Sequence, residues 1–280
     1  MGVPRLGLAL GGGGARGLAH AGVLLELAES GIRPTAVAGT SMGAVVGGLY
    51  AVGQDVGRLV EVIGQLDLRE IFGVPESYRQ MLERSVGQAL LERFRRTSWW
   101  EEPSPRLARL YEFLGLFCKG RRFEGLPLPF AAVCADLDSG EEVDLRRGPL
   151  YRGLAASAAI PGVFQPVPWA GRFLIDGGVV NNLPVDVVQQ LGAESVLAVD
   201  VSAPLFAAPR SMVEIVLQSY AITAKELARV KLARAADSLG DRLMVIRPQV
   251  DGIGVLEFER LPEAVEAGRA AAAAALERYG

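Results

Sequence analysis

The sequence predicts an α/β protein in which helices cover a mainly parallel central sheet. Short apolar runs alternate along the chain with segments of helical periodicity, as in proteins built from β-α-β units. Half of the 280 residues are hydrophobic, which is ample for a packed core. Because no repeat or linker-like tract divides the chain, we expect one domain over residues 1–280.

The composition argues against several classes of protein. Two cysteines and one histidine give no disulfide framework and make a zinc site improbable, so we expect neither a metal nor another cofactor. With 29 basic against 32 acidic residues and no basic block, nucleic acid is not an expected partner. The first ten residues lack a signal-peptide core, and no apolar run is long enough to span a membrane. We therefore expect a cytoplasmic protein, and peripheral contact with a membrane is left open.

The first fifty residues predict two successive strand-loop-helix units. Leu6–Leu10 is an apolar run typical of a strand buried on both faces, and the glycines after it precede a helix at Ala15–Glu29. Thr35–Ala38 is a second short strand, followed by a helix of small residues at Ala44–Val52.

A helical insertion is expected over about residues 54–125. Amphipathic spacing and proline breaks predict helices at Val56–Leu66, Ser77–Arg96 and Pro105–Phe117. The insertion also carries aromatic residues flanked by arginines, which we interpret as core in preference to a surface for lipid headgroups. The aromatic residues are Phe94, Trp99, Trp100, Phe113, Phe117 and Phe123, and the arginines are Arg93, Arg95, Arg96, Arg121 and Arg122.

The rest of the chain again alternates between strands and helices. Strands are expected at Phe130–Asp136, Glu142–Leu145, Phe164–Pro168, Phe173–Ile175, Ser195–Val201 and Leu243–Pro248. Helices are expected at Gly148–Ala159, Pro184–Leu191, Met212–Ser238 and Pro262–Tyr279, so that C-terminal helices occupy about residues 211–279.

Residues 39–43 read GTSMG, a serine on a tight turn between a strand and a helix. Small residues on both sides let the chain turn sharply and lift the Ser41 hydroxyl clear of the sheet. The following helix directs its positive N-terminus to the same point, which favours an oxyanion there. An ordinary strand-to-helix turn is the alternative interpretation.

Residues 11–17 read GGGGARG and follow the first strand. Their spacing matches a dinucleotide fingerprint, but no carboxylate ends the next strand to bind a ribose, which argues against NAD. The loop also lacks the Lys-Ser/Thr of a Walker motif. The same array of backbone N–H groups would serve as an oxyanion hole.

Residues 176–178, Asp-Gly-Gly, come directly after a predicted strand. They form either a simple turn or the position of a general base facing Ser41. A carboxylate is a weak base at neutral pH, so in the second case burial would have to raise the pKa of Asp176.

In this order, the three motifs resemble those of the patatin-like phospholipases. The resemblance covers about residues 6–202 and includes the stretches at residues 157–164 and 176–184. It implies a three-layer α/β/α fold and a lipid or ester substrate hydrolysed by a Ser41–Asp176 dyad. The amides of Gly12, Gly13 and Gly14 would hold the oxyanion. Residues that would support the motifs are Arg16, Gly17, Gly39, Gly43, Gly177 and Gly178.

The single histidine, His20, lies in the first helix before both dyad residues. We interpret it as a buried, hydrogen-bonded structural residue and not as a third catalytic group. Arg16 could either orient the glycine loop or meet a lipid phosphate. Two other functions stay open: a catalytically silent lipid-binding or regulatory protein, and a nucleotide-binding protein. The sequence predicts no oligomeric state.

Overall fold

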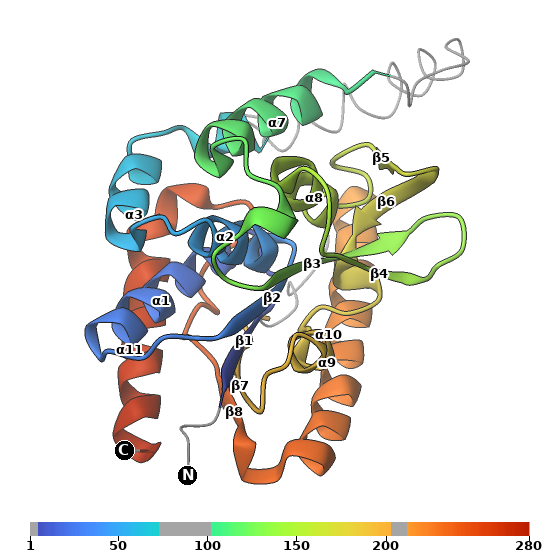
Figure 1. The fold of residues 1–280 in the computed structure, drawn as a ribbon. Helices are drawn as coiled ribbons and strands as arrows, with labels where there is room; N and C mark the ends of the chain where they lie inside the picture. Colours follow the sequence, from blue (N-terminus) through green and yellow to red (C-terminus); the bar gives the residue numbers. More distant parts are fainter. Residues whose placement is uncertain (1–4, 73–101, 203–211, 280) are drawn as a thin grey trace.

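The computed structural model describes residues 5–72, 102–202 and 212–279. Within them, eight strands form one sheet in the order β5-β6-β3-β2-β1-β7-β8, with β4 paired to β3 (Figure 1). β2, β1, β7 and β8 continue the sheet from β3 in parallel, whereas β4, β5 and β6 are joined by antiparallel pairs. The strands are β1 Leu6–Leu10, β2 Ala36–Thr40, β3 Phe130–Asp136, β4 Glu142–Leu145, β5 Val167–Trp169, β6 Arg172–Asp176, β7 Ser195–Val199 and β8 Leu243–Ile246.

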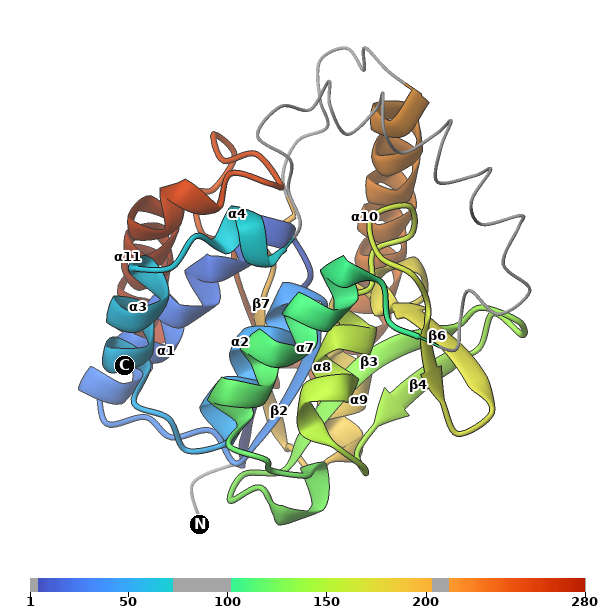
Figure 2. The same ribbon diagram turned by 90° about the horizontal axis from the view of Figure 1, so that it is seen from above.

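Helices lie on both faces of this sheet, so the predicted α/β/α arrangement is confirmed (Figure 2). The α-helices are α1 Ala19–Glu29, α2 Met42–Ala51, α3 Val56–Gly64, α4 Leu68–Ile71, α7 Pro105–Cys118, α8 Leu150–Ser157, α9 Val185–Gln190, α10 Met212–Leu239 and α11 Leu261–Tyr279. In the described part of the chain, none of them is long and apolar enough to cross a membrane.

The two faces of the sheet bury different clusters of side chains. In β1, Leu8 and Leu10 join the cluster that packs under α1, α2 and α11, while Ala9 points to the cluster beneath α9 and α10. The alternation follows from the pleat of a strand, which sends successive side chains to opposite faces. All three side chains are fully buried, as the unbroken apolar run of this segment predicts.

The described part of the insertion is helical, as expected. Asp55 and Ser104 cap α3 and α7 by accepting hydrogen bonds from the backbone N–H of Arg58 and Leu107. The short helix α4 was not predicted, and the helix predicted at Ser77–Arg96 lies outside the described residues.

The aromatic residues that are described in the insertion belong to the core. Phe113 and Phe123 are buried, and Phe117 packs against them from a partly buried position. Phe123 stacks on Phe130 of β3, with ring centroids 5.8 Å apart. Phe94, Trp99 and Trp100 and the arginines Arg93, Arg95 and Arg96 lie outside the described residues.

Helices α1 and α11 cross at a pair of glycines. A Cβ on Gly22 would lie 1.9 Å from the carbonyl oxygen of Val265, and one on Gly268 would lie 2.0 Å from that of Ala19. Backbone therefore meets backbone at this crossing, and α11 closes over the helix that follows the glycine loop.

We expect Gly22→Ala to lower the free energy of unfolding by about 1–3 kcal/mol, because the added methyl group must push the two helices apart. Chemical denaturation checks this value. Gly115→Ala is the matched control, since a Cβ there meets no atom within 4 Å and should raise helix stability slightly. Equal stability of Gly22→Ala and wild type would contradict this account of the crossing.

Candidate active site

Strands β2 and β6 reach the same edge of β3 from opposite directions, because β4 holds the other edge. β2 runs parallel to β3 and ends with Thr40 opposite Val133. β6 runs antiparallel and ends with Asp176 opposite Cys134, the next residue of β3. The register thus brings Ser41, which follows Thr40, next to Asp176, and the two line one cavity.

Ser41 stands on a strained turn. Its backbone has φ 56° and ψ −125°, a conformation that non-glycine residues adopt rarely and that is found where a nucleophile is lifted from a sheet. The turn is tight enough that a Cβ on Gly43 would lie 2.1 Å from the carbonyl oxygen of Leu10, and one on Gly39 would lie 2.4 Å from that of Gly43. Both glycines of the motif are therefore required by close approach of the backbone.

Two hydroxyl groups hold this turn to its neighbours. The backbone N–H of Ser41 donates to Oγ of Ser157 at 3.0 Å, and the Ser157 hydroxyl donates to the carbonyl of Val133 at 2.6 Å. The Thr40 hydroxyl donates to the carbonyl of Asn181 at 2.7 Å. No role for Ser157 was predicted from its residue type or position. Its one signal was a polar residue among four alanines in an otherwise buried helix end.

Asp176 is fully buried and unevenly hydrogen-bonded. Its Oδ1 accepts from the backbone N–H of Gly178 at 2.8 Å and from the hydroxyl of Tyr220 at 3.0 Å. Among the described residues Oδ2 has no hydrogen bond of ordinary geometry. Burial raises the pKa of Asp176 to about 6, although the Ser41 hydroxyl, Gly178 and Tyr220 pull it down. At neutral pH this group is an ionised carboxylate and a stronger base than an exposed aspartate.

The glycine loop lies against both residues, but it offers fewer free amides than predicted. The N–H of Gly12 donates to the carbonyl of Asn182 at 3.0 Å, and Nδ2 of Asn182 donates back to the Gly12 carbonyl at 3.2 Å. Gly12 is therefore not a free oxyanion donor, because the Asn182 carbonyl occupies its amide. The amides of Gly13 and Gly14 have no acceptor within the described residues.

His20 occupies the structural position predicted for it. It is fully buried, and its Nε2–H donates to the carbonyl of Gly11 at 2.7 Å. Burial lowers the pKa of His20 to about 4, so the ring is neutral at pH 7. Arg16 follows the glycine loop in sequence, and its Nε donates to the carbonyl of Ile253 at 2.6 Å.

A cavity of about 370 Å³ opens over these groups. Apolar side chains from three parts of the chain contribute to its wall, among them Ile160, Val163, Val255 and Leu256. Lys225 and Arg69 bring positive charge, and Glu257 and Glu259 bring negative charge. Within the described residues, no group of histidine, cysteine, aspartate and glutamate side chains could hold a metal ion.

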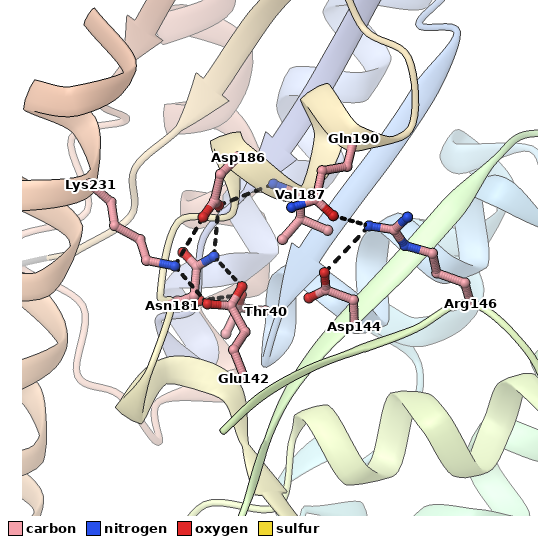
Figure 3. A network of polar contacts seen from close by, with 9 residues as sticks. All are labelled: Thr40, Glu142, Asp144, Arg146, Asn181, Asp186, Val187, Gln190 and Lys231. Atoms are coloured by element: carbon pink, nitrogen blue, oxygen red, sulfur yellow. Dashed lines mark hydrogen bonds and ion pairs between the residues drawn. The ribbon is translucent and has the colours of Figure 1, made fainter. Parts of the chain in front are cut away.

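A charged network ties α10 to the turn after Asp176 (Figure 3). Nζ of Lys231 lies 2.6 Å from Glu142 and 3.1 Å from Asp186, and Nδ2 of Asn181 donates to the same two carboxylates. Because the Asn181 carbonyl also accepts from Thr40, the network reaches the residue before Ser41. Lys231 was not singled out from the sequence, since a lysine on a helix is usually solvated.

These features describe an α/β protein with a serine elbow, a buried aspartate and a glycine loop at the ends of its strands. The sequence model of the Patatin-like phospholipase family matches residues 8–188. The chain belongs to this family, and the resemblance inferred from its three motifs is confirmed.

Relatives of the chain carry related names. The uncharacterized NTE family protein MT2641 of Mycobacterium tuberculosis is 31% identical over 302 residues, which cover 97% of this chain and 46% of that protein. Patatin-like phospholipase domain-containing protein 7 of Rattus norvegicus is 32% identical over 216 residues, covering 71% of this chain and 14% of that protein. The chain thus spans about half the length, or less, of these relatives.

Among solved structures, VipD from Legionella pneumophila is similar over 98% of this chain and 66% of its own, with 16% identity and a TM-score of 0.48. A similarity of this size carries no argument about function.

The buried carboxyl group predicts a pH-dependent stability. Because the pKa of Asp176 is about 6 in the folded chain and about 3.9 when unfolded, the folded state binds this proton more tightly. Stability from this group is greatest below pH 4 and falls as the pH rises to 6, by about 3 kcal/mol. Asp176→Asn removes the titration and keeps the acceptor at Oδ1, so its stability relative to wild type should rise over that window.

Urea unfolding between pH 4 and pH 7 measures this difference. Asp138→Asn is the control, because Asp138 is exposed in the hairpin turn after β3. A pH-independent difference between Asp176→Asn and wild type would contradict the raised pKa.

Proposed function

We propose that the chain is a serine hydrolase that cleaves carboxylic esters of lipids, with Ser41 as nucleophile and Asp176 as general base. One observation carries the proposal: a strained serine and a buried aspartate of raised pKa line one cavity, where the register of β2 and β6 on β3 brings them together. Membership of the Patatin-like phospholipase family supports the choice of a lipid ester.

In the first half-reaction, Oγ of Ser41 attacks the ester carbonyl carbon while Asp176 accepts the hydroxyl proton. Negative charge develops on the carbonyl oxygen. The free amides of Gly13 and Gly14, with the N-terminus of α2, are the donors available to stabilise it. The bond to the alcohol then breaks, and Asp176 returns its proton to the leaving oxygen, which gives an acyl-enzyme and a free alcohol.

In the second half-reaction, water replaces the alcohol. The water oxygen attacks the acyl carbon while Asp176 takes a proton from the water. The same amides hold the second oxyanion. When the bond to Oγ breaks, the proton passes from Asp176 back to Ser41 and the carboxylic acid leaves. No histidine takes part, which fits the placement of His20 beneath the loop with its ring bound to Gly11.

The cavity wall fits an amphiphilic substrate. Its apolar residues, such as Ile160 and Val255, can pack against an acyl chain, and Lys225 provides a positive charge for an anionic headgroup. We therefore infer a phospholipid or lysophospholipid as the substrate in preference to a small uncharged ester.

A silent lipid-binding protein is the second candidate, favoured by nothing in the site beyond the cavity itself. It would not need a strained backbone at Ser41 or an aspartate buried at the expense of stability. A nucleotide-binding function is weaker still, because the Gly12 amide is bound to Asn182 and is not open to a phosphate.

We expect Ser41→Ala and Asp176→Asn each to reduce esterase activity by at least about 10³-fold, because each removes one partner of the nucleophilic step. Hydrolysis of a panel of lysophospholipids, phospholipids and p-nitrophenyl esters measures this. Ser30→Ala and Asp138→Asn, both exposed and outside the three motifs, are the matched controls. A fluorophosphonate probe should label wild type at Ser41. Wild-type rates in both site variants would exclude the dyad, and an inactive, unlabelled wild type would favour the silent binder.

The activity should also depend on the ionisation of Asp176. Because the base must be deprotonated and its pKa is about 6, kcat/KM should fall about tenfold per pH unit below pH 6 and level off above it. Initial rates with a soluble ester between pH 4.5 and 8 check this. If kcat/KM instead falls only below about pH 4, the base has the pKa of an exposed aspartate, and the raised pKa of Asp176 is contradicted.

A further inference from the structure

We propose that Tyr220 of α10 is a positioning residue for Asp176: its hydroxyl fixes the orientation of the carboxylate so that Oδ2 is left for the proton of Ser41. This inference rests on the proposed function and adds to it a residue from a part of the chain that follows the family match at residues 8–188. Nothing in the sequence pattern pointed to it, because 44 residues separate Tyr220 from Asp176.

The contact itself is specific. The Tyr220 hydroxyl lies 3.0 Å from Oδ1 of Asp176, the same oxygen that accepts from the Gly178 amide at 2.8 Å. Two donors on one oxygen fix the plane of the carboxylate, and within the part of the chain that the structure describes Oδ2 has no hydrogen bond of ordinary geometry. An acceptor without a partner is what a general base requires before it takes a proton.

The hydroxyl can act only as a donor under working conditions. Burial, with the negative charge of Asp176 beside it, raises the pKa of Tyr220 well above its usual value. The phenol therefore stays protonated whenever Asp176 is ionised, and it stabilises the charged form of the carboxyl group. In agreement with this, Tyr220 lowers the pKa of Asp176 against the effect of burial.

The Tyr220 hydroxyl packs closely against Gly178, where a residue with a side chain would meet it. A Cβ on Gly178 would lie 2.1 Å from the Tyr220 hydroxyl oxygen. The ring of Tyr220 lines the cavity, while its hydroxyl reaches past Gly178 to the aspartate. A side chain at this second glycine after Asp176 would therefore have to displace the Tyr220 hydroxyl from its contact with the carboxylate.

Helix α10 is held in the register that this contact needs. Tyr220, Ala224, Ala228 and Lys231 follow one another at helical spacing along one face, and both alanines are buried. Lys231 pairs with Glu142 and Asp186 farther along the same face (Figure 3). The ion pairs of Lys231 and the buried alanines therefore hold α10 in the position that brings the Tyr220 hydroxyl to Asp176.

Few other groups act on the charge of Asp176. Besides Tyr220, the Ser41 hydroxyl and the Gly178 amide face it, and Cys134 lies opposite it on β3 as a buried thiol whose pKa is raised well above its usual value. The causes that shift the pKa of Asp176 are its burial and its hydrogen bonds with Ser41, Gly178 and Tyr220. The charged side chains that line the same cavity are Arg16, Arg69, Lys225, Glu257 and Glu259.

Tyr220→Phe tests the inference, because it removes the hydroxyl and keeps the ring. The pKa of Asp176 should rise, so the acidic limb of the kcat/KM profile should move to higher pH by about one unit. We expect kcat at pH 7 to fall about tenfold with KM changed less than twofold, and part of the loss to be regained at pH 8.5. Tyr50→Phe, a half-buried tyrosine at the far end of α2, is the matched control and should keep the wild-type profile.

Thermal unfolding verifies that Tyr220→Phe is folded. The pH dependence of the rate at which a fluorophosphonate labels Ser41 gives a second measurement of the Asp176 pKa. A loss of activity at every pH with an unmoved limb, or a wild-type profile, would overturn the role of Tyr220. If Ser41→Ala or Asp176→Asn retains activity, the proposed function fails instead, and the two failures are distinguishable.

Discussion

The site depends on the pairing register of β3. One edge of this strand carries β2 and then β6, which run toward each other and end at adjacent positions, Val133 and Cys134. A slip of either strand would separate Ser41 from Asp176 and would also turn every side chain of that strand to the other face. The same strand supplies the carbonyl that Ser157 uses to hold the Ser41 amide. The packing of both sheet faces therefore maintains the geometry of a small polar site.

Two residues near the point where β2 and β6 meet on β3 are in energetically unfavourable states. Ser41 has a positive φ, and Asp176 is buried with one oxygen that finds no hydrogen bond of ordinary geometry among the residues described. Both lower stability, and both persist because neighbouring elements determine their positions: Ser157 and Thr40 fix the turn, and Gly178 and Tyr220 fix the carboxylate. Strain that is concentrated on two residues with complementary chemistry is typical of active sites.

Much of the fold was predictable from local pattern. The bounds of β1, β3 and β4 agree with their predicted ranges, because each is an apolar or alternating run that glycine, proline or charged residues delimit. The helix predicted from Ala15 begins instead as a 3-10 turn at Gly14–Leu18, since the chain must first leave the glycine loop. The glycine loop lines the same cavity as Ser41, but its pattern did not predict that the Gly12 amide is bound to Asn182, which is 170 residues away.

The sequence by itself determined the residue types and the order of three motifs, and these were enough for the family and the fold class. The types of these residues, a serine, an aspartate and a set of glycines, indicate the chemistry. Their spacing indicates the turns on which they lie. The tertiary structure alone decided that Asn182 occupies the Gly12 amide, how far burial raises the pKa of Asp176, and that Tyr220 of α10 reaches its carboxylate. Those properties depend on contacts between segments distant in the chain, and a local pattern cannot encode a partner that only folding brings near.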